Sequence, residues 1–248
     1  VGDITGFSAA SYLRGVRFFQ LPTTFLAAID SSVGGKTGVN LSAGKNLAGA
    51  FYQPSLVLCD PDTFSTLPAE VFADGIAEAV KYGVIADRSL FDILAHGELS
   101  AHLDDVVERC VQIKSRIVES DEFDRGERQL LNFGHSIGHA IEKCSGFTVT
   151  HGHAVGIGMV LMARAARLSS FSPADCEAPI RAALLRHGLP AETDSPFEHI
   201  LDAMGCDKKC QGDAITLILP EEIGVCRLKS FAVSSLPAFL SPAFLKEM

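Results

Sequence analysis

The sequence has no uninterrupted apolar run of the roughly 18–20 residues that a membrane-spanning helix needs. It also lacks the basic stretch and the apolar segment of a secretory signal peptide. We therefore expect a cytoplasmic protein without a membrane partner. The 248 residues are 47% hydrophobic, which is enough for a substantial core in one large domain or two smaller ones.

Positive charge is scarce in this chain. The 21 Lys and Arg residues stand against 30 Asp and Glu, so the formal net charge is −9. This balance argues against nucleic acid or an anionic membrane surface as the main partner. A small anionic ligand is still compatible with it, because a few basic side chains can converge locally. The candidates are Lys36, Lys45, Lys81, Lys114 and Arg128.

Paired cysteine spacings are also missing. The seven cysteines are an odd number and are scattered along the chain, a pattern typical of reduced thiols in the cytosol. Cys206 and Cys210 could in principle ligate a metal. Because Lys208 and Lys209 place positive charge between them, we expect these two thiols to have structural or incidental roles.

The glycine-rich segment 30–40 lacks one residue that a P-loop requires. Gly35 and Lys36 resemble the end of that motif, but Asp30 occupies the place of its first glycine. This argues against a nucleotide triphosphatase. The small residues still let the backbone approach a ligand closely, and Lys36 and Lys45 offer charge to a phosphate.

The chain changes from an α/β pattern to a helical pattern near residue 68. Short β-type runs cover residues 16–21 and 55–60. Helical periodicity covers 69–85 and 103–118, and further helices are expected near 128–145, 152–170 and 174–187, before a short strand at 214–219. No internal repeat, low-complexity segment or heptad run is present. The pattern predicts an α/β N-terminal part followed by a mainly α-helical C-terminal domain.

The most informative stretch runs from Arg128 to His139. As one helix, it would place Arg128, Asn132, His135 and His139 on one face, with apolar residues around them. Burying unpaired polar groups costs roughly 1–3 kcal/mol each, so this stripe predicts a cavity that holds charge. The alternative is a solvated helix face with two ordinary histidines.

The chemistry of the stripe favours an anion or a metal. Arg, Asn and His can donate hydrogen bonds to an anion, and His can ligate a metal. Downstream, His151 and His153 supply further imidazoles at the expected start of another helix. A catalytic zinc needs two or three ligands from separate elements and one position left open, which this pattern could provide.

Two lysines on expected helices each have two interpretations. Glu78 and Lys81 lie three residues apart on one face and could form an ordinary surface ion pair. Lys114 falls inside the apolar stripe of 103–118, where it either extends its ammonium to water or points into a polar site.

The chain resembles the 3-dehydroquinate synthase family in a series of motifs that covers nearly its whole length. Each motif alone is weak, but their order and spacing together are specific. They are Arg14-Gly-Val, Pro22-Thr-Thr, Asp30-Ser-Ser-Val-Gly-Gly-Lys-Thr, Gly44-Lys-Asn, Gly49-Ala-Phe-Tyr-Gln-Pro, Glu78-Ala-Val-Lys, Asn132-Phe-Gly-His-Ser-Ile-Gly-His, His151-Gly and Asp207-Lys-Lys.

The resemblance implies an N-terminal α/β domain that binds NAD and a helical C-terminal domain that carries zinc, with the active site in the cleft between them. Residues 1–67 would be the end of the first domain, and residues 68–248 the helical metal- and substrate-binding domain. The chain begins with Val1 and would start just after the family's glycine-rich cofactor turn. We therefore expect the sequence to be N-terminally truncated and to bind NAD poorly in this form.

The resemblance also implies roles for individual residues. It assigns zinc, with another divalent ion such as Co²⁺ as the alternative, to Glu78, His135 and His151. It assigns contacts with NAD to Asp3, Thr23, Thr24, Asp30, Lys45, Thr63 and Thr66. It assigns catalytic roles to Lys36, Lys81, Lys114, Arg128, Asn132 and His139. Substrate binding falls to Asn46, Lys208, Lys209 and Arg14, the last reaching in from the partner subunit of a homodimer.

Two positions depart from the family pattern. His153 stands where the family often has an acidic residue, and could compete for metal or support a ligand from behind. Asp124 stands where the family usually has Glu, which shortens the carboxylate arm by one methylene. Neither departure removes an implied metal ligand.

The implied reaction converts 3-deoxy-arabino-heptulosonate 7-phosphate, an anionic sugar phosphate, into 3-dehydroquinate and phosphate in the shikimate pathway of aromatic amino acid and chorismate biosynthesis. NAD oxidises a secondary alcohol transiently, phosphate leaves, and the ketone is reduced back, so the net reaction is a lyase step. Three alternatives stay open. They are another NAD-dependent sugar phosphate cyclase whose substrate lacks the carboxylate, a metal-dependent alcohol dehydrogenase of related architecture, and an inactive fragment that only binds metal or dimerises.

Overall fold

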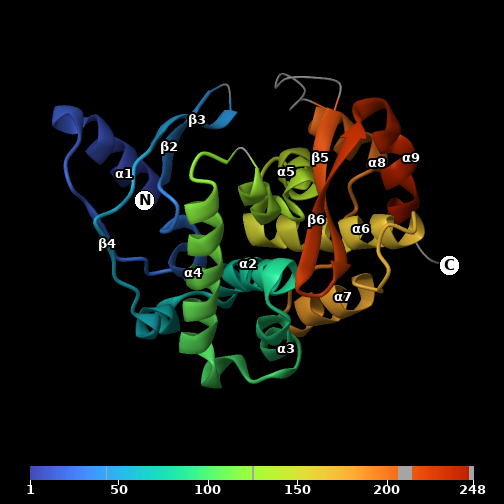
Figure 1. Cartoon of the computed structure of the whole chain (residues 1–248), viewed down its shortest axis with the longest axis horizontal. Coiled ribbons are helices and arrows are strands. Elements are labelled where there is room, and N and C mark those ends of the chain that lie inside the picture. Colours follow the sequence, from blue (N-terminus) through green and yellow to red (C-terminus); the bar gives the residue numbers. More distant parts are fainter. Residues whose placement is uncertain (43, 125, 206–213, 246–248) are drawn as a thin grey trace. The chain divides into compact units, whose positions relative to one another are not determined.

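The computed structural model describes residues 1–42, 44–124, 126–205 and 214–245 (Figure 1). The sequence-based candidates Cys206, Lys208, Lys209 and Cys210 lie outside the described residues. The chain divides into two compact units. The first consists of residues 1–75 and 103–128, and the second of residues 76–102 and 129–248.

The first unit holds short strands, short helical turns, the helices α1 and α4, and the start of α2. Its elements in chain order are α1 (Gly2–Ser11), η1 (Tyr12–Arg14), β1 (Phe19–Gln20), the π-type turn η2 (Ala27–Ser31), β2 (Lys36–Leu41), β3 (Gly44–Phe51), β4 (Leu56–Val57), η3 (Pro61–Thr66), the first part of α2 (Ala69–Ala86) and α4 (Leu103–Ser120). β1 and β4 pair in parallel inside the two expected β-type runs. α4 confirms the helix expected over 103–118.

β2 and β3 form an antiparallel hairpin that periodicity did not predict. Gly38 lies opposite Gly49, and these two backbones approach each other closely, because a Cβ atom at Gly49 would lie 2.1 Å from the carbonyl oxygen of Thr37. Glycine has low β-propensity, so strands that need it for close approach carry little strand signal in their sequence.

The second unit is mainly helical. It contains the rest of α2, then α3 (Arg88–His96), η4 (Leu99–Ala101), η5 from residue 129 onward (Glu127–Asn132), α5 (His135–Cys144), α6 (His151–Leu168), α7 (Glu177–Arg186), α8 (Phe197–Gly205), the antiparallel strands β5 (Ala214–Glu222) and β6 (Val225–Ala232), η7 (Val233–Ser235), α9 (Leu236–Leu240) and η8 (Ser241–Phe244). The expected helices over 69–85, 152–170 and 174–187 and the strand at 214–219 are confirmed within a few residues at their ends.

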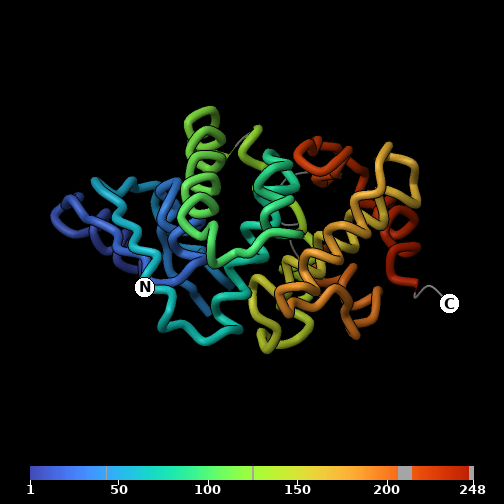
Figure 2. Tube along the Cα trace, turned by 90° about the horizontal axis from the view of Figure 1, so that it is seen from below, coloured from blue at the N-terminus to red at the C-terminus, as the bar shows by residue number. Residues whose placement is uncertain are grey.

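α6 forms the core of the second unit. Figure 2 shows it as one continuous helix, and every residue from Gly152 to Ala166 except His153 is buried. It packs against α5, α7 and β5, so it is apolar on all sides as a central helix must be. None of the described helices, α6 included, combines the length and apolar content of a membrane-spanning helix.

The expectation of a single helix from Arg128 to His139 is wrong. η5 ends at Asn132, and α5 begins only at His135. Between them Gly134 adopts φ +80°, a left-handed conformation that glycine accepts and that breaks a right-handed helix. A Cβ atom at Gly134 would also lie 2.6 Å from Cγ of Met159 and 2.8 Å from the carbonyl oxygen of Val155, so the break lets α5 pack directly on α6.

Close packing of α5 on α6 predicts a large cost for a methyl group at Gly158. A Cβ atom there would lie 2.1 Å from the carbonyl oxygen of Gly134. We expect Gly158→Ala to lower the free energy of unfolding by about 1–3 kcal/mol, the usual cost of overpacking, as measured by urea denaturation. The control is Gly156→Ala on the same helix, whose Cβ would come no closer to a neighbouring atom than 3.3 Å, from Cδ2 of Leu184. Equal stability of the two variants would contradict the packing described here.

The described cysteines carry no disulfide. Cys59, Cys110, Cys144, Cys176 and Cys226 are all free thiols. This agrees with the expectation of reduced cysteines for the part of the chain that the structure describes.

Candidate metal centre and active site

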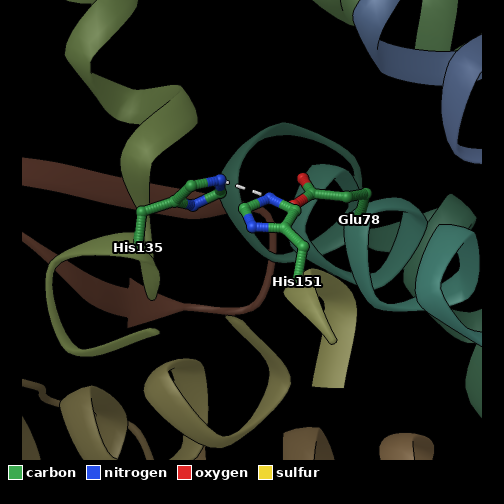
Figure 3. A group of neighbouring side chains, drawn as sticks. All are labelled: Glu78, His135 and His151. Atoms are coloured by element: carbon green, nitrogen blue, oxygen red, sulfur yellow. Dashed lines mark ion pairs between the residues drawn. The ribbon is translucent and has the colours of Figure 1, made fainter. Parts of the chain in front are cut away.

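Three side chains from three helices converge in the second unit (Figure 3). Glu78 comes from α2, His135 from α5 and His151 from α6. Oε1 of Glu78 lies 3.4 Å from Nε2 of His135 and 3.3 Å from Nε2 of His151. One ligand atom from each of the three residues lies within 4.8 Å of the others, which is a suitable arrangement for one metal ion.

Local structure aims both imidazoles toward Glu78. His135 and His151 are the first residues of α5 and α6, and the close packing of these helices brings the two rings to 5.2 Å between centroids. Nδ1 of His135 lies 3.2 Å from the carbonyl oxygen of Phe133, which leaves Nε2 directed at the carboxylate. A hydrogen bond on one ring nitrogen is the usual device that fixes which nitrogen faces a metal.

Glu78 has the environment of a metal ligand rather than of a surface residue. Glu78 is 0% exposed and its ion-pair partner Lys81 is 2% exposed, so the interpretation of the two as a surface pair is wrong. Neither carboxylate oxygen of Glu78 has a hydrogen-bond partner among the described residues. Because an unsatisfied buried carboxylate is strongly unfavourable, these oxygens and the two imidazoles fit a bound divalent cation.

Burial and neighbouring charges perturb the pKa values in this cluster. Burial raises the pKa of Glu78, but the positive charges of Lys81 and the neighbouring histidines outweigh it and hold that pKa well below its usual value. Burial, with the charges of Lys81 and His151, lowers the pKa of His135 to about 3. Burial opposes the charged form of His151 too, yet the carboxylates of Glu142 and Glu78 beside its two ring nitrogens raise its pKa to about 10.

Glu142 is a residue of this cluster that the sequence reasoning missed. It is 4% exposed, and its Oε2 lies 3.4 Å from Nδ1 of His151. The available signal was its spacing, because Glu142 follows His135 by seven residues and His139 by three, which places all three on one face of α5.

His139 lies beside the three converging side chains but differs from them in exposure. Its ring lies 5.4 Å from that of His135 and 5.9 Å from that of His151, between centroids, and its side chain is exposed. His139, Glu142 and His151 form a second group whose ligand atoms lie within 4.8 Å of one another. Asn132, at the end of η5, is half-buried three residues before His135.

His153 does not belong to either group of potential ligands among the described residues. Its Nδ1 lies 2.7 Å from Oγ1 of Thr150, the residue that precedes α6. Of the two roles open for His153, competition for the metal therefore has no geometric support.

A second cluster of charged side chains lies in the first unit. Nζ of Lys114 lies 2.9 Å from Oδ1 of Asp30 and also donates to the carbonyl oxygen of Asp30. The ammonium thus points at a polar partner within the unit rather than extending to water. Asp3 is close enough to both to interact electrostatically, and burial raises its pKa.

Lys36 and Arg128 contact the segment around Asp124, the position at which the family usually has Glu. Nζ of Lys36, at the start of β2, lies 2.6 Å from Oδ2 of Asp124. Arg128 is 2% exposed and donates to the carbonyl oxygens of Gly34, at 2.9 Å, and Glu122. The buried Nε of Arg128 has no hydrogen-bond partner among the described residues, so this guanidinium keeps one donor for a ligand.

The other described residues with implied roles lie in the first unit. Arg14 is exposed with φ +65°, and Asn46 has φ +53° with its N–H donating to Oδ1 of Asn40. Thr24, Thr63 and Thr66 use their hydroxyls in local hydrogen bonds with the backbone. Thr23 and Lys45 are exposed. The cofactor and substrate roles of this group stay predictions.

The chain matches two family models along most of its length. Residues 1–74 match the N-terminal model of 3-dehydroquinate synthase, and residues 75–210 match the C-terminal model. A 3-dehydroquinate synthase from Clostridium botulinum is 43% identical over 236 residues, which are 93% of this chain and 67% of that protein. The chain thus spans about two thirds of the length of this relative.

Solved structures of two sugar phosphate cyclases share the fold. A 2-epi-5-epi-valiolone synthase from Streptomyces hygroscopicus with NAD⁺ and Zn²⁺ bound has a TM-score of 0.86 and 26% identity, covering 97% of this chain and 70% of that one. A 2-deoxy-scyllo-inosose synthase complexed with carbaglucose-6-phosphate, NAD⁺ and Co²⁺ has a TM-score of 0.85 and 26% identity, covering 97% of this chain and 71% of that one. From the two family models and the 43% identity, the chain belongs to the 3-dehydroquinate synthase family.

Proposed function

We propose that this chain acts as a 3-dehydroquinate synthase, with one divalent metal held by Glu78, His135 and His151. The observation that carries the proposal is the convergence of these three ligands in a chain 43% identical to a 3-dehydroquinate synthase. The substrate would be 3-deoxy-arabino-heptulosonate 7-phosphate and the products 3-dehydroquinate and phosphate. The bound cofactors of the two related cyclases support NAD as cofactor and zinc or cobalt as the metal.

The proposed division of roles is the one that the family resemblance implies, and it differs from the two compact units, because residues 103–128 belong to the first unit. Residues 1–67 would be the end of an α/β domain that contacts NAD, and residues 68–248 the helical domain that holds metal and substrate. The two family models meet between residues 74 and 75, close to that boundary. A homodimer and a cytoplasmic location belong to the same proposal and rest on the family alone.

A metal in this site would act as a Lewis acid on a substrate hydroxyl and on the carbonyl formed from it. The chain's own residues prepare that position. Lys81 keeps Glu78 ionised, and its ammonium would donate to a neighbouring substrate hydroxyl. His139, exposed beside the rings of His135 and His151, would transfer a proton on the phosphate side of the substrate.

Anion binding falls to the basic and amide groups of the same proposal. Asp30 holds Lys114 in place through two contacts, which orients its ammonium. Arg128 offers its unpaired Nε, and Asn132 lies three residues from a proposed ligand. We propose that these groups, with Lys36 and the family-implied Asn46, hold the phosphate and carboxylate of the substrate. Lys208 and Lys209 lie outside the described residues and enter only through the resemblance.

Metal binding should release close to one proton per chain at pH 7. His151, with its pKa raised to about 10, is protonated there, whereas His135, with its pKa lowered to about 3, is neutral. Because a histidine ligand must be neutral, His151 has to lose its proton, and the metal affinity should rise by about tenfold per pH unit between about pH 7 and 10. Calorimetric titration of metal-depleted protein with zinc in two buffers of different ionisation enthalpy measures the proton count. Binding without proton release would contradict the charge state described for His151.

Phosphate release tests the proposed reaction directly. We expect release from 3-deoxy-arabino-heptulosonate 7-phosphate that needs the metal and saturating NAD⁺, and that is slow with residues 1–248 because we expect this chain to bind NAD poorly. Glucose 6-phosphate, which lacks the carboxylate, is the matched comparison. Preferential release from glucose 6-phosphate would favour another sugar phosphate cyclase, an alternative that the fold of the two related cyclases keeps open. Release from neither substrate, with metal bound, would favour the inactive alternative.

A further inference from the structure

The carboxylate of Glu142 has no role in the proposed reaction, yet it is one of the few buried acids of the second unit. Glu142 lies on α5, is 4% exposed, and follows His139 by one helical turn. A buried carboxylate is retained only when its neighbours compensate the loss of water. Its nearest proposed metal ligand is His151, across the packed faces of α5 and α6.

The ring of His151 lies between two carboxylates. Its Nε2 lies 3.3 Å from Oε1 of Glu78, and its Nδ1 lies 3.4 Å from Oε2 of Glu142. The ring nitrogens are on opposite sides of the imidazole, so one of them can bind a metal beside Glu78 while the other donates a hydrogen bond to Glu142. Such a hydrogen bond fixes the tautomer and orientation of a ligand and raises its basicity.

We infer that Glu142 is a positioning residue that accepts a hydrogen bond from Nδ1–H of His151 and thereby directs Nε2 of His151 to the metal. The inference rests on the proposed metal site at Glu78, His135 and His151. His135 has a different device for the same purpose, because its Nδ1 lies against the carbonyl oxygen of Phe133. The two histidine ligands are thus oriented independently, one by backbone and one by Glu142.

The second group of potential ligands, His139, Glu142 and His151, would give Glu142 a different role, that of a metal ligand. If a metal lay among His139, Glu142 and His151, the carboxylate of Glu142 would bind it directly, on the Nδ1 side of His151. Nδ1 cannot carry a proton for Glu142 and bind a metal at the same time. The group with Glu78 is favoured, because the buried carboxylate of Glu78 has its ion pair with Lys81 but no further hydrogen bond among the described residues, whereas His139 is exposed.

The test compares Glu142→Ala, Glu142→Gln and wild type, all depleted of metal and then titrated with zinc against a chromophoric chelator. Glu142→Ala should still bind one zinc, with a Kd weakened by about 10–100-fold. Glu142→Gln should recover part of this loss, because an amide oxygen accepts the same hydrogen bond without the charge. The matched control is Glu177→Gln, a buried acid of the same unit whose partners are Arg164 and Arg167. It should lose stability and keep the wild-type Kd.

An NMR signal distinguishes a role of Glu142 in orienting His151 from a role in stability alone. The Nδ1 proton of His151 should give a downfield ¹H NMR signal in the zinc-bound protein that survives in Glu177→Gln and disappears in Glu142→Ala. An unchanged Kd and an unchanged signal in Glu142→Ala would overturn the inference while leaving the metal site intact. Complete loss of zinc from both Glu142→Ala and His139→Ala, with zinc retained by His135→Ala, would assign the metal to the second group. Absence of zinc binding by wild type would instead refute the proposed metal site itself.

Discussion

Substitution of either histidine ligand should remove the metal. In His135→Ala and in His151→Ala, we expect the zinc content after dialysis to fall from one per chain to near zero, and turnover to fall with it. Three protein ligands are the usual minimum for a catalytic zinc, and each substitution leaves two. Without the metal, the negative charge of Glu78 is also less well compensated, which is unfavourable because Glu78 is 0% exposed.

The control for this pair is His153→Ala. His153 lies two residues from His151 on the same helix, but its Nδ1 contacts the hydroxyl of Thr150 and it belongs to neither group of potential ligands among the described residues. We expect this variant to keep its zinc. Full zinc retention by both His135→Ala and His151→Ala would refute the ligand assignment.

The second large effect is expected at His139, and it separates chemistry from metal binding. His139→Ala should keep one zinc per chain and lose about 10²-fold or more in kcat, the usual contribution of a group that transfers a proton. The reason is that His139 is exposed beside the rings of His135 and His151, whereas the site already has three ligands that are buried or partly buried and must keep a position open for substrate.

An exposed histidine on another helix provides the comparison. His96→Ala, at the end of α3, should leave both zinc content and kcat unchanged. Metal analysis and phosphate release on the two variants give both quantities from the same preparations. If His139→Ala loses zinc as completely as His135→Ala does, then His139 is a ligand and its proposed role in proton transfer is wrong.

The sequence predicted the types of residue that form the site. It predicted less well the backbone conformation that brings them together. Periodicity identified α2, α4, α6 and α7, because each has an apolar face of sufficient length. The polar residues of the stripe were identified correctly as unusual, yet the helix that was meant to align them is interrupted at Gly134. Periodicity alone cannot detect such a break, since glycine fits both a helix and the left-handed conformation that ends one.

Contacts between distant segments explain the remaining failures. The spacing of Glu142 from His135 and His139 did not by itself reveal a functional residue, because the importance of Glu142 depends on His151, which belongs to a different helix. The burial of Glu78 and Lys81 could not be predicted either, because ordinary surface ion pairs have the same separation of three residues. For Glu78, the resemblance to a family supplied what the spacing could not, because it assigned a ligand role to a residue that local chemistry would have left at the surface.

X-ray diffraction at the zinc absorption edge tests the central claim most directly. From crystals of zinc-loaded protein, we expect one strong anomalous peak per chain, within about 2.0–2.2 Å of Nε2 of His135, Nε2 of His151 and a carboxylate oxygen of Glu78. A peak bound instead by His139 and Glu142, or no ordered peak at all, would contradict the metal centre on which the proposed function depends.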